Sequence, residues 1–183
     1  MVTAQERPAP LAIAKITNLE DKFLYDTAGM YDAEIRFLEA LQLTLPHIQN
    51  NQLKSLFETH IRETQQQIKN LEQVFSAIGQ QPTRVNCDVA AGAVSDGQKE
   101  MLLSAETPSL LELTIAGEQA KVEHLEVISY RCLIQVAEQM GQNQVVELLR
   151  QNLQQEEQTV QKLEQCSPQL LQEALSTSRS ARR

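Results

Sequence analysis

The sequence contains no tryptophan, and aromatic residues make up only 4% of its 183 residues. Glycine and proline number six each, which is too few for many short strands joined by turns and favours a few long helices. No stretch approaches 18 consecutive apolar residues, so we expect no membrane-spanning helix. Cys87, Cys132 and Cys166 are widely spaced and form no CxxC motif. We therefore expect reduced thiols in a cytoplasmic protein rather than disulfides.

Basic residues are also scarce: 16 Lys and Arg stand against 24 Asp and Glu, which gives a net charge of −8. This balance argues against nucleic acid as a partner. The length suits one domain with its own core. We expect residues 1–17 to form a flexible arm, residues 18–176 a single helical domain, and residues 177–183 a disordered tail.

Apolar residues recur at helical spacing in four long segments, residues 18–45, 50–78, 107–140 and 143–165. Leu45-Pro46 ends the first segment, and Thr107-Pro108 begins the third. The connection over residues 80–106 is long and includes a short helix near 88–103, while Pro168 separates the fourth helix from a short one that ends near residue 176. Hairpin, long connection, hairpin is the order of a ferritin-like fold. The predicted fold is therefore all-α, a ferritin-like four-helix bundle with one long crossover connection and a short extra helix.

Polar residues interrupt the apolar stripe of every long helix near its middle. Glu34 shares the face of its first-helix neighbours, and Glu123 and Glu126 lie one turn apart in the third helix. In the second helix His60 and Glu63 are one turn apart, with Gln67 one turn further along. The candidate metal ligands are Glu34, His60, Glu63, Glu123, Glu126 and Glu156.

Several carboxylates that converge inside a bundle require a cation, because each buried charge is costly by itself. Oxygen ligands with a few imidazoles favour iron or manganese. The alternative is that a chain with 24 acids places some of them on solvated stripe edges by chance. We interpret Tyr130 as a core residue rather than a redox partner, and Cys132 as a buried apolar residue.

Several sequence runs resemble the YciE/YciF family of bacterial stress-associated proteins. They are residues 31–34, His60 with 63–68, Cys87 with 91–92, 121–130 and 153–163. The resemblance implies a ferritin-like bundle, usually a homodimer, related to the di-iron carboxylate proteins of the rubrerythrin and ferritin group. The name ferroxidase has been attached to family members by homology, and their physiological substrate is not established. Exposed apolar surface at Phe23, Phe37 and Val127 is a further reason to expect a homodimer.

The chain departs from the usual di-iron pattern, because it has no Glu-x-x-His motif and shows the reverse order at His60-x-x-Glu63. Whether Glu63 or Gln67 is the second-helix ligand stays open. Three functions therefore remain: a di-iron or di-manganese oxidoreductase that acts on Fe(II), O2 or peroxide; a stress or interaction protein with a degenerate site; and a metal-free helical adaptor. The protein as isolated could lack its metal, and the sequence does not decide whether it is an enzyme.

Overall fold

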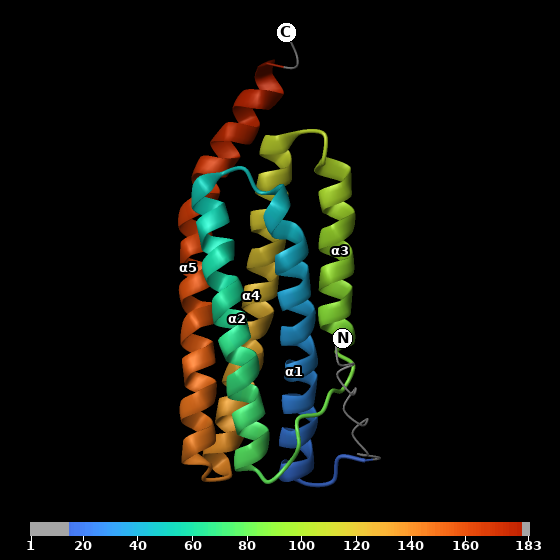
Figure 1. Cartoon of the computed structure of the whole chain (residues 1–183), viewed down its shortest axis with the longest axis vertical. Helices are drawn as coiled ribbons and strands as arrows, with labels where there is room; N and C mark the ends of the chain where they lie inside the picture. The colour runs from blue at the N-terminus through green and yellow to red at the C-terminus, as the bar shows by residue number, and fades with distance from the viewer. Residues whose placement is uncertain (1–14, 181–183) are drawn as a thin grey trace, which may run out of the picture.

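The computed structural model describes the backbone of residues 15–180 and the side chains of residues 15–177. Its helices are α1 (Leu19–Thr44), α2 (Asn51–Ala77), α3 (Asp88–Ser104), α4 (Pro108–Gln139) and α5 (Asn143–Ser180), with a 3-10 turn at Leu45–His47. The four long helices form an antiparallel bundle, and α3 lies along α1 and α4 (Figure 1). No strand occurs within residues 15–180. The predicted all-α bundle with a crossover and an extra helix is confirmed.

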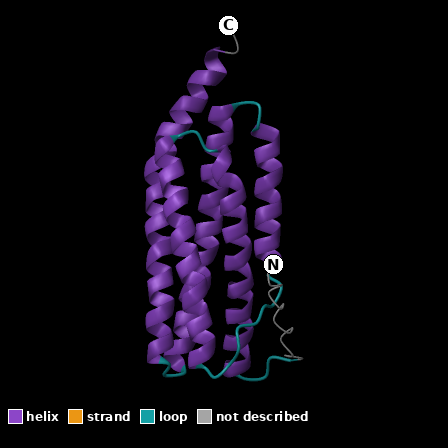
Figure 2. Ribbon diagram, viewed as in Figure 1, coloured by secondary structure: helices purple, strands orange, loops and turns teal. Residues whose placement is uncertain are grey.

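The helix ends follow local sequence signals. The Asn18 side chain accepts a hydrogen bond of 2.7 Å from the Asp21 amide, and the Asn50 side chain accepts bonds from two amides in the first turn of α2. Gly79 and Gly141 follow α2 and α4 with φ of 70°, a left-handed conformation that glycine adopts without strain. The α1–α2 and α4–α5 hairpins close through short loops, with Asn50 at the end of the first loop and Gly141 in the second (Figure 2). Gly79 instead begins the long crossover connection between α2 and α3.

The predicted break at Pro168 is wrong, because α5 runs without interruption through this residue. A proline inside a helix removes one hydrogen bond. The apolar stripe nevertheless continues past it, and Cys166, Leu170 and Ala174 are each at most 3% exposed. Packing of this face against the bundle outweighs the local effect. Residues 177–180, expected in a tail, belong to α5, while 1–14 and 181–183 lie outside the described residues.

Two apolar clusters occupy the two halves of the bundle. One includes Phe23, Phe75 and Leu149, and the other includes Leu41 and Phe57. Between them lies a buried polar section, to which each long helix contributes. Phe23, expected on the surface, is fully buried. Phe37, also expected there, is only 2% exposed, so neither supplies a dimer interface.

Asp32 fastens the long crossover connection to α1. Its carboxylate is 3% exposed and accepts hydrogen bonds from Arg36, from Arg84 and from the Cys87 amide, the last at 2.9 Å. Burial raises the pKa of Asp32, but these donors outweigh it and hold the pKa below its ordinary value. The anchored connection leads into α3 at a fixed position beside α1.

We expect Asp32→Ala to lower the free energy of unfolding by roughly 2–3 kcal/mol, because two guanidinium groups and one amide lose a charged acceptor. Urea denaturation followed by circular dichroism measures the change. The matched control is Asp96→Ala on α3, since Asp96 is exposed and its nearest cation, Lys99, is 4.0 Å away. Equal effects of the two substitutions would show that Asp32 is not an anchor.

Candidate metal centre

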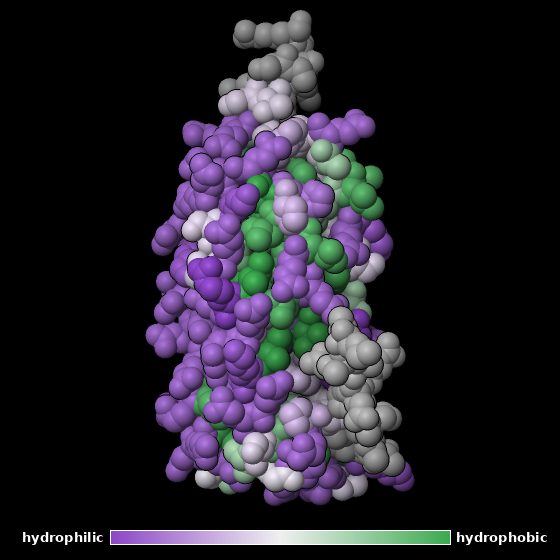
Figure 3. All heavy atoms as spheres, viewed as in Figure 1, coloured by the Kyte–Doolittle hydropathy of each residue, from purple (hydrophilic) through white to green (hydrophobic). Residues whose placement is uncertain are grey.

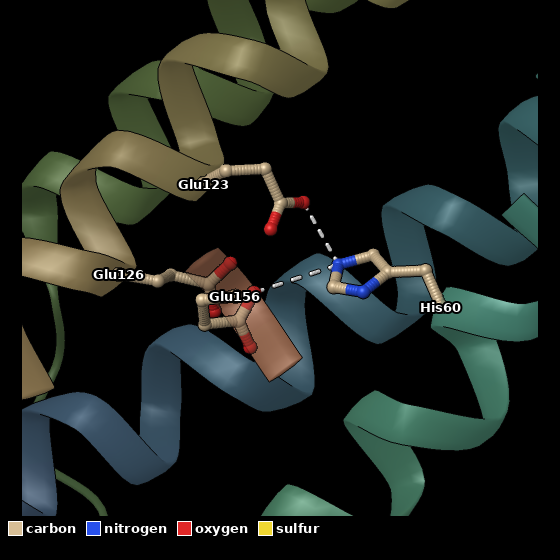
Figure 4. A group of neighbouring side chains, drawn as sticks. All are labelled: His60, Glu123, Glu126 and Glu156. Atoms are coloured by element: carbon tan, nitrogen blue, oxygen red, sulfur yellow. Dashed lines mark ion pairs between the residues drawn. The ribbon is translucent and has the colours of Figure 1, made fainter. Parts of the chain in front are cut away.

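Side chains from three helices meet in the polar section of the bundle. His60 comes from α2, Glu123 and Glu126 from α4, and Glu156 from α5, and each is at most 1% exposed. One ligand atom from each of the four lies within 4.8 Å of the others (Figure 4). Four donors at such distances can surround one cation.

Hydrogen bonds orient several of these side chains. His60 Nε2 lies 2.9 Å from Glu123 Oε1, and the Gln119 side-chain amide donates to the same oxygen at 2.6 Å. The Gln67 side chain donates to Glu156 Oε1. From α1, Glu34 is fully buried and accepts a hydrogen bond from the Tyr130 hydroxyl. The carboxylates of Glu34, Glu123 and Glu156 are thus held in fixed orientations.

Some carboxylate oxygens have no hydrogen-bond partner among the described residues. They are both oxygens of Glu126 and one oxygen each of Glu34, Glu63, Glu123 and Glu156. Buried polar atoms in proteins are normally paired, and an isolated buried oxygen is costly. A cation at the centre of the group would satisfy these oxygens together. The residues therefore fit a metal ion, and the excess of carboxylates over imidazoles fits iron or manganese.

Burial and mutual repulsion change the proton affinities of these groups. Burial raises the pKa of Glu34 to about 8 and raises the pKa values of Glu126 and Glu156 well above the ordinary value, and the neighbouring carboxylates add to the effect at Glu126 and Glu156. Burial lowers the pKa of His60, but Glu123 and other carboxylates outweigh this and raise it to about 10. Glu123 has a pKa below its usual range because His60 and its hydrogen-bond donors overcome the effect of burial. Without a cation, the core holds extra protons.

Five of the six predicted ligands occupy this section, and Glu63 lies at its edge. Glu63 Oε2 is 3.8 Å from His60 Nδ1, its side chain is 19% exposed, and it is outside the group of four. Gln67, the alternative in the second helix, is fully buried and contacts Glu156. The geometry therefore favours Gln67 over Glu63 as the α2 residue beside the centre.

The sequence interpretation missed a polar network next to the carboxylates. The Asn70 side chain donates to Asn152 Oδ1 at 2.7 Å, and Asn152 donates to the Tyr130 hydroxyl at 2.9 Å. Tyr130 is therefore both a core residue and a hydrogen-bond donor to Glu34. A signal for Asn152 exists, because it lies one helical turn before Glu156 on the same stripe.

The cysteines differ in exposure, and among the described residues none forms a disulfide. Cys166 is buried and Cys87 is half-buried. The expectation that Cys132 is buried is wrong, since it is exposed. Its neighbour Leu133 takes the inward position, and the next residue along a helix faces about 100° away.

Residues 18–176 match the family described as a domain of unknown function, DUF892. The chain belongs to the DUF892 family. It is 30% identical to protein YciF of Escherichia coli K12 over 146 residues, which cover 79% of this chain and 87% of that protein. The resemblance to the YciE/YciF family seen in the sequence is confirmed.

Solved structures of DUF892-like bundles share the fold. The crystal structure of the E. coli stress protein YciF matches with a TM-score of 0.80 and 27% identity, over 86% of this chain and 99% of that one. A Rhodopseudomonas palustris protein named YcfI matches with a TM-score of 0.79 and 31% identity, over 84% and 98% of the two chains.

Across the described residues, no helix is long and apolar enough to cross a membrane.

We expect the metal-free protein to lose stability as the pH rises from about 5 to about 8, because Glu34 and Glu126 bind protons in the folded state that the unfolded chain has already released. A carboxyl group whose pKa is raised by folding stabilises the folded state fully at pH values below its ordinary pKa. This stabilisation is lost as the pH rises through the pKa that the group has in the folded state. The raised pKa of His60 extends the same trend above its ordinary value of 6.5. Urea unfolding midpoints, measured across this pH range with a chelator present, test whether the stability falls as the pH rises.

Glu126→Gln serves as the matched variant for this measurement. It removes one titrating group and keeps the side-chain shape, so the slope of stability against pH should become shallower. A free energy of unfolding that increases between pH 5 and 8 would show that these carboxyls are ionised in the folded protein.

Proposed function

We propose that this DUF892 protein is a ferritin-like di-metal carboxylate protein, with iron or manganese as its metals, that acts as an oxidoreductase on Fe(II), O2 or peroxide. The single observation that carries the proposal is the set of unpartnered carboxylate oxygens in the group around His60, where four ligand atoms lie within 4.8 Å of one another. Glu126 is the main candidate ligand, because neither of its oxygens has a protein donor.

The residues divide into metal holders and residues that orient them. One ion would be held by His60, Glu123, Glu126 and Glu156. A second ion would be held by Glu34 together with carboxylates of the same buried group. Iron or manganese bound there would supply one-electron chemistry toward O2 or peroxide. Around the ligands, Gln119 orients Glu123, and Gln67 orients Glu156.

Proton release is part of the binding event in this proposal. Glu34, Glu126 and Glu156 have raised pKa values, so they keep their protons to a higher pH than an exposed carboxyl does when no cation is present. A metal ion needs deprotonated ligands and displaces these protons. The two apolar clusters on either side exclude water and strengthen the attraction between cation and carboxylate.

A degenerate site in a stress or interaction protein is the second candidate, and one observation favours it. His60 already neutralises Glu123 at 2.9 Å, and Tyr130 and Gln67 already donate to Glu34 and Glu156. In that case the core is a proton-balanced hydrogen-bond network without a metal. A homodimer in the cytoplasm is compatible with both functions, and exposed Leu102 and Leu103 on α3 offer apolar surface for it.

We expect freshly purified wild type, loaded anaerobically with Fe(II), to bind iron and to melt at a higher temperature, because a ligand that binds only the folded state stabilises it. Glu126→Ala should bind little or no iron. Its metal-free form should be as stable as wild type or more stable, since a buried carboxyl whose two oxygens have no hydrogen-bond partner among the described residues is gone. Metal analysis by mass spectrometry and thermal unfolding with and without Fe(II) measure both effects.

Glu118→Ala is the matched control on the same helix. Glu118 belongs to a second acidic group with Asp96 and Glu100, which is at the surface rather than buried, so this variant should retain the iron and the melting shift of wild type. The oxidoreductase proposal fails if wild type binds neither Fe(II) nor Mn(II) and its melting temperature does not change when either is added. The metal-free network then replaces it.

A further inference from the structure

A cleft of about 430 Å³ lies between α1, α4 and the residues that precede α3. Its lining includes Tyr25 and Ile128, which are 40% and 54% exposed, so the cleft opens to solvent. The lining also includes Glu126, which is 1% exposed and has no partner for either carboxylate oxygen. The cleft therefore runs from the surface to Glu126, one of the four residues of the candidate metal centre, whose carboxylate oxygens are themselves closed off from solvent.

Gly29 on α1 leaves this cleft open. It lies in the interior of a 26-residue helix, where glycine costs about 1 kcal/mol relative to alanine. A Cβ atom at this position would meet nothing within 4 Å, so close helix packing does not require glycine here. Its φ is not positive either, since Gly79 and Gly141 are the positive-φ glycines of the described residues. What the missing side chain provides is free volume in the cleft.

Several side chains along the otherwise largely apolar cleft can bind cations. Asp88 and Asp26 contribute carboxylates, the latter paired with Lys22, and Cys87 and Cys132 contribute thiols. Carboxylates and thiolates bind divalent first-row metals, and the net charge of −8 favours the approach of cations.

A second cleft, of about 380 Å³, differs from the first both in its lining and in the residues that it reaches. It lies between α1, α3 and α4, on the face where apolar side chains gather in a band (Figure 3). It reaches Gln119, whose side chain bonds to Glu123, but its described lining includes none of the six candidate ligands. Phe37 lines both clefts and lies between them.

We propose that the cleft beside Gly29 is the entrance through which divalent cations reach the buried carboxylates, with Glu126 as the first buried group that they meet. This inference rests on the proposed metal-binding function. It adds that the substrate which passes along this path is a metal ion. Gly29, Cys87 and Cys132 line the path and do not hold the ion at its destination.

Gly29→Leu tests the entrance by filling it. The probe is Co(II), whose visible absorption reports binding to protein ligands in a stopped-flow experiment. We expect Co(II) to enter Gly29→Leu about tenfold more slowly than wild type, which corresponds to about 1.4 kcal/mol of added barrier. The amount bound at equilibrium should not change, because no ligand is altered.

Gly117→Leu is the matched control. Gly117 is an exposed helical glycine on α4, and a Cβ atom added there would meet nothing within 4 Å. It is absent from the described lining of both clefts, so the variant should load at the wild-type rate. Circular dichroism and thermal unfolding verify that both variants are folded.

Thiol alkylation gives a second measurement that does not depend on Gly29→Leu folding. Adducts of N-ethylmaleimide at Cys87 and Cys132 should slow Co(II) entry into wild type. The Cys87→Ser/Cys132→Ser double variant, treated in the same way, should load at its untreated rate, since Cys166 is buried.

The outcomes separate the two proposals. If wild type binds no Co(II) at equilibrium, the proposed function and the entrance fail together. If wild type binds Co(II) but Gly29→Leu and the alkylated protein load at the control rate, the entrance is wrong and the metal centre stands. Loss of equilibrium binding in folded Gly29→Leu would also overturn the entrance, because the glycine would then belong to the centre itself.

Discussion

The structure depends on the electrostatic cost of placing several carboxylates in one dry section of a helical bundle. Glu34, Glu123, Glu126 and Glu156 are buried together, and one imidazole, His60, offers the opposing charge. An ionised carboxylate in an apolar medium costs many kcal/mol, so such a group must bind a proton, a hydrogen-bond donor or a cation. The apolar clusters on either side stabilise the fold enough to hold these groups in place.

One turn of α1 joins this section to the periphery of the molecule. Asp32 faces the crossover connection, where it accepts hydrogen bonds from Arg84 and from the Cys87 amide, while Glu34, two residues later, faces the core. Because Asp32 fixes the position of Cys87, it also fixes one wall of the cleft that ends at Glu126. The crossover connection therefore shapes the proposed approach to the candidate centre as well as the fold.

Sequence periodicity predicted the four long helices and the inward direction of Glu34, Glu126 and Glu156, since these residues interrupt apolar stripes. It could not predict the helix through Pro168, because that depends on contacts of Leu170 with the rest of the bundle. Nor could it choose between Glu63 and Gln67, which lie one turn apart on the same helix. The partners that other helices supply, such as Asn152 for Tyr130, follow only from the three-dimensional packing.

The observed hydrogen-bond network and the proposed metal centre would be two charge-balanced states of the same core. In the first state, protons on the carboxyls and on His60 offset the buried charge, as the raised pKa values of Glu34 and His60 indicate. In the second, cations would replace those protons, and His60 would have to give up its own to become a nitrogen ligand. His60 Nε2 lies 2.9 Å from Glu123, so the proton between them would have to leave before both groups could bind a shared ion. The difference between a metal protein and a metal-free bundle therefore reduces to competition between protons and divalent cations for Glu123, Glu126 and Glu156.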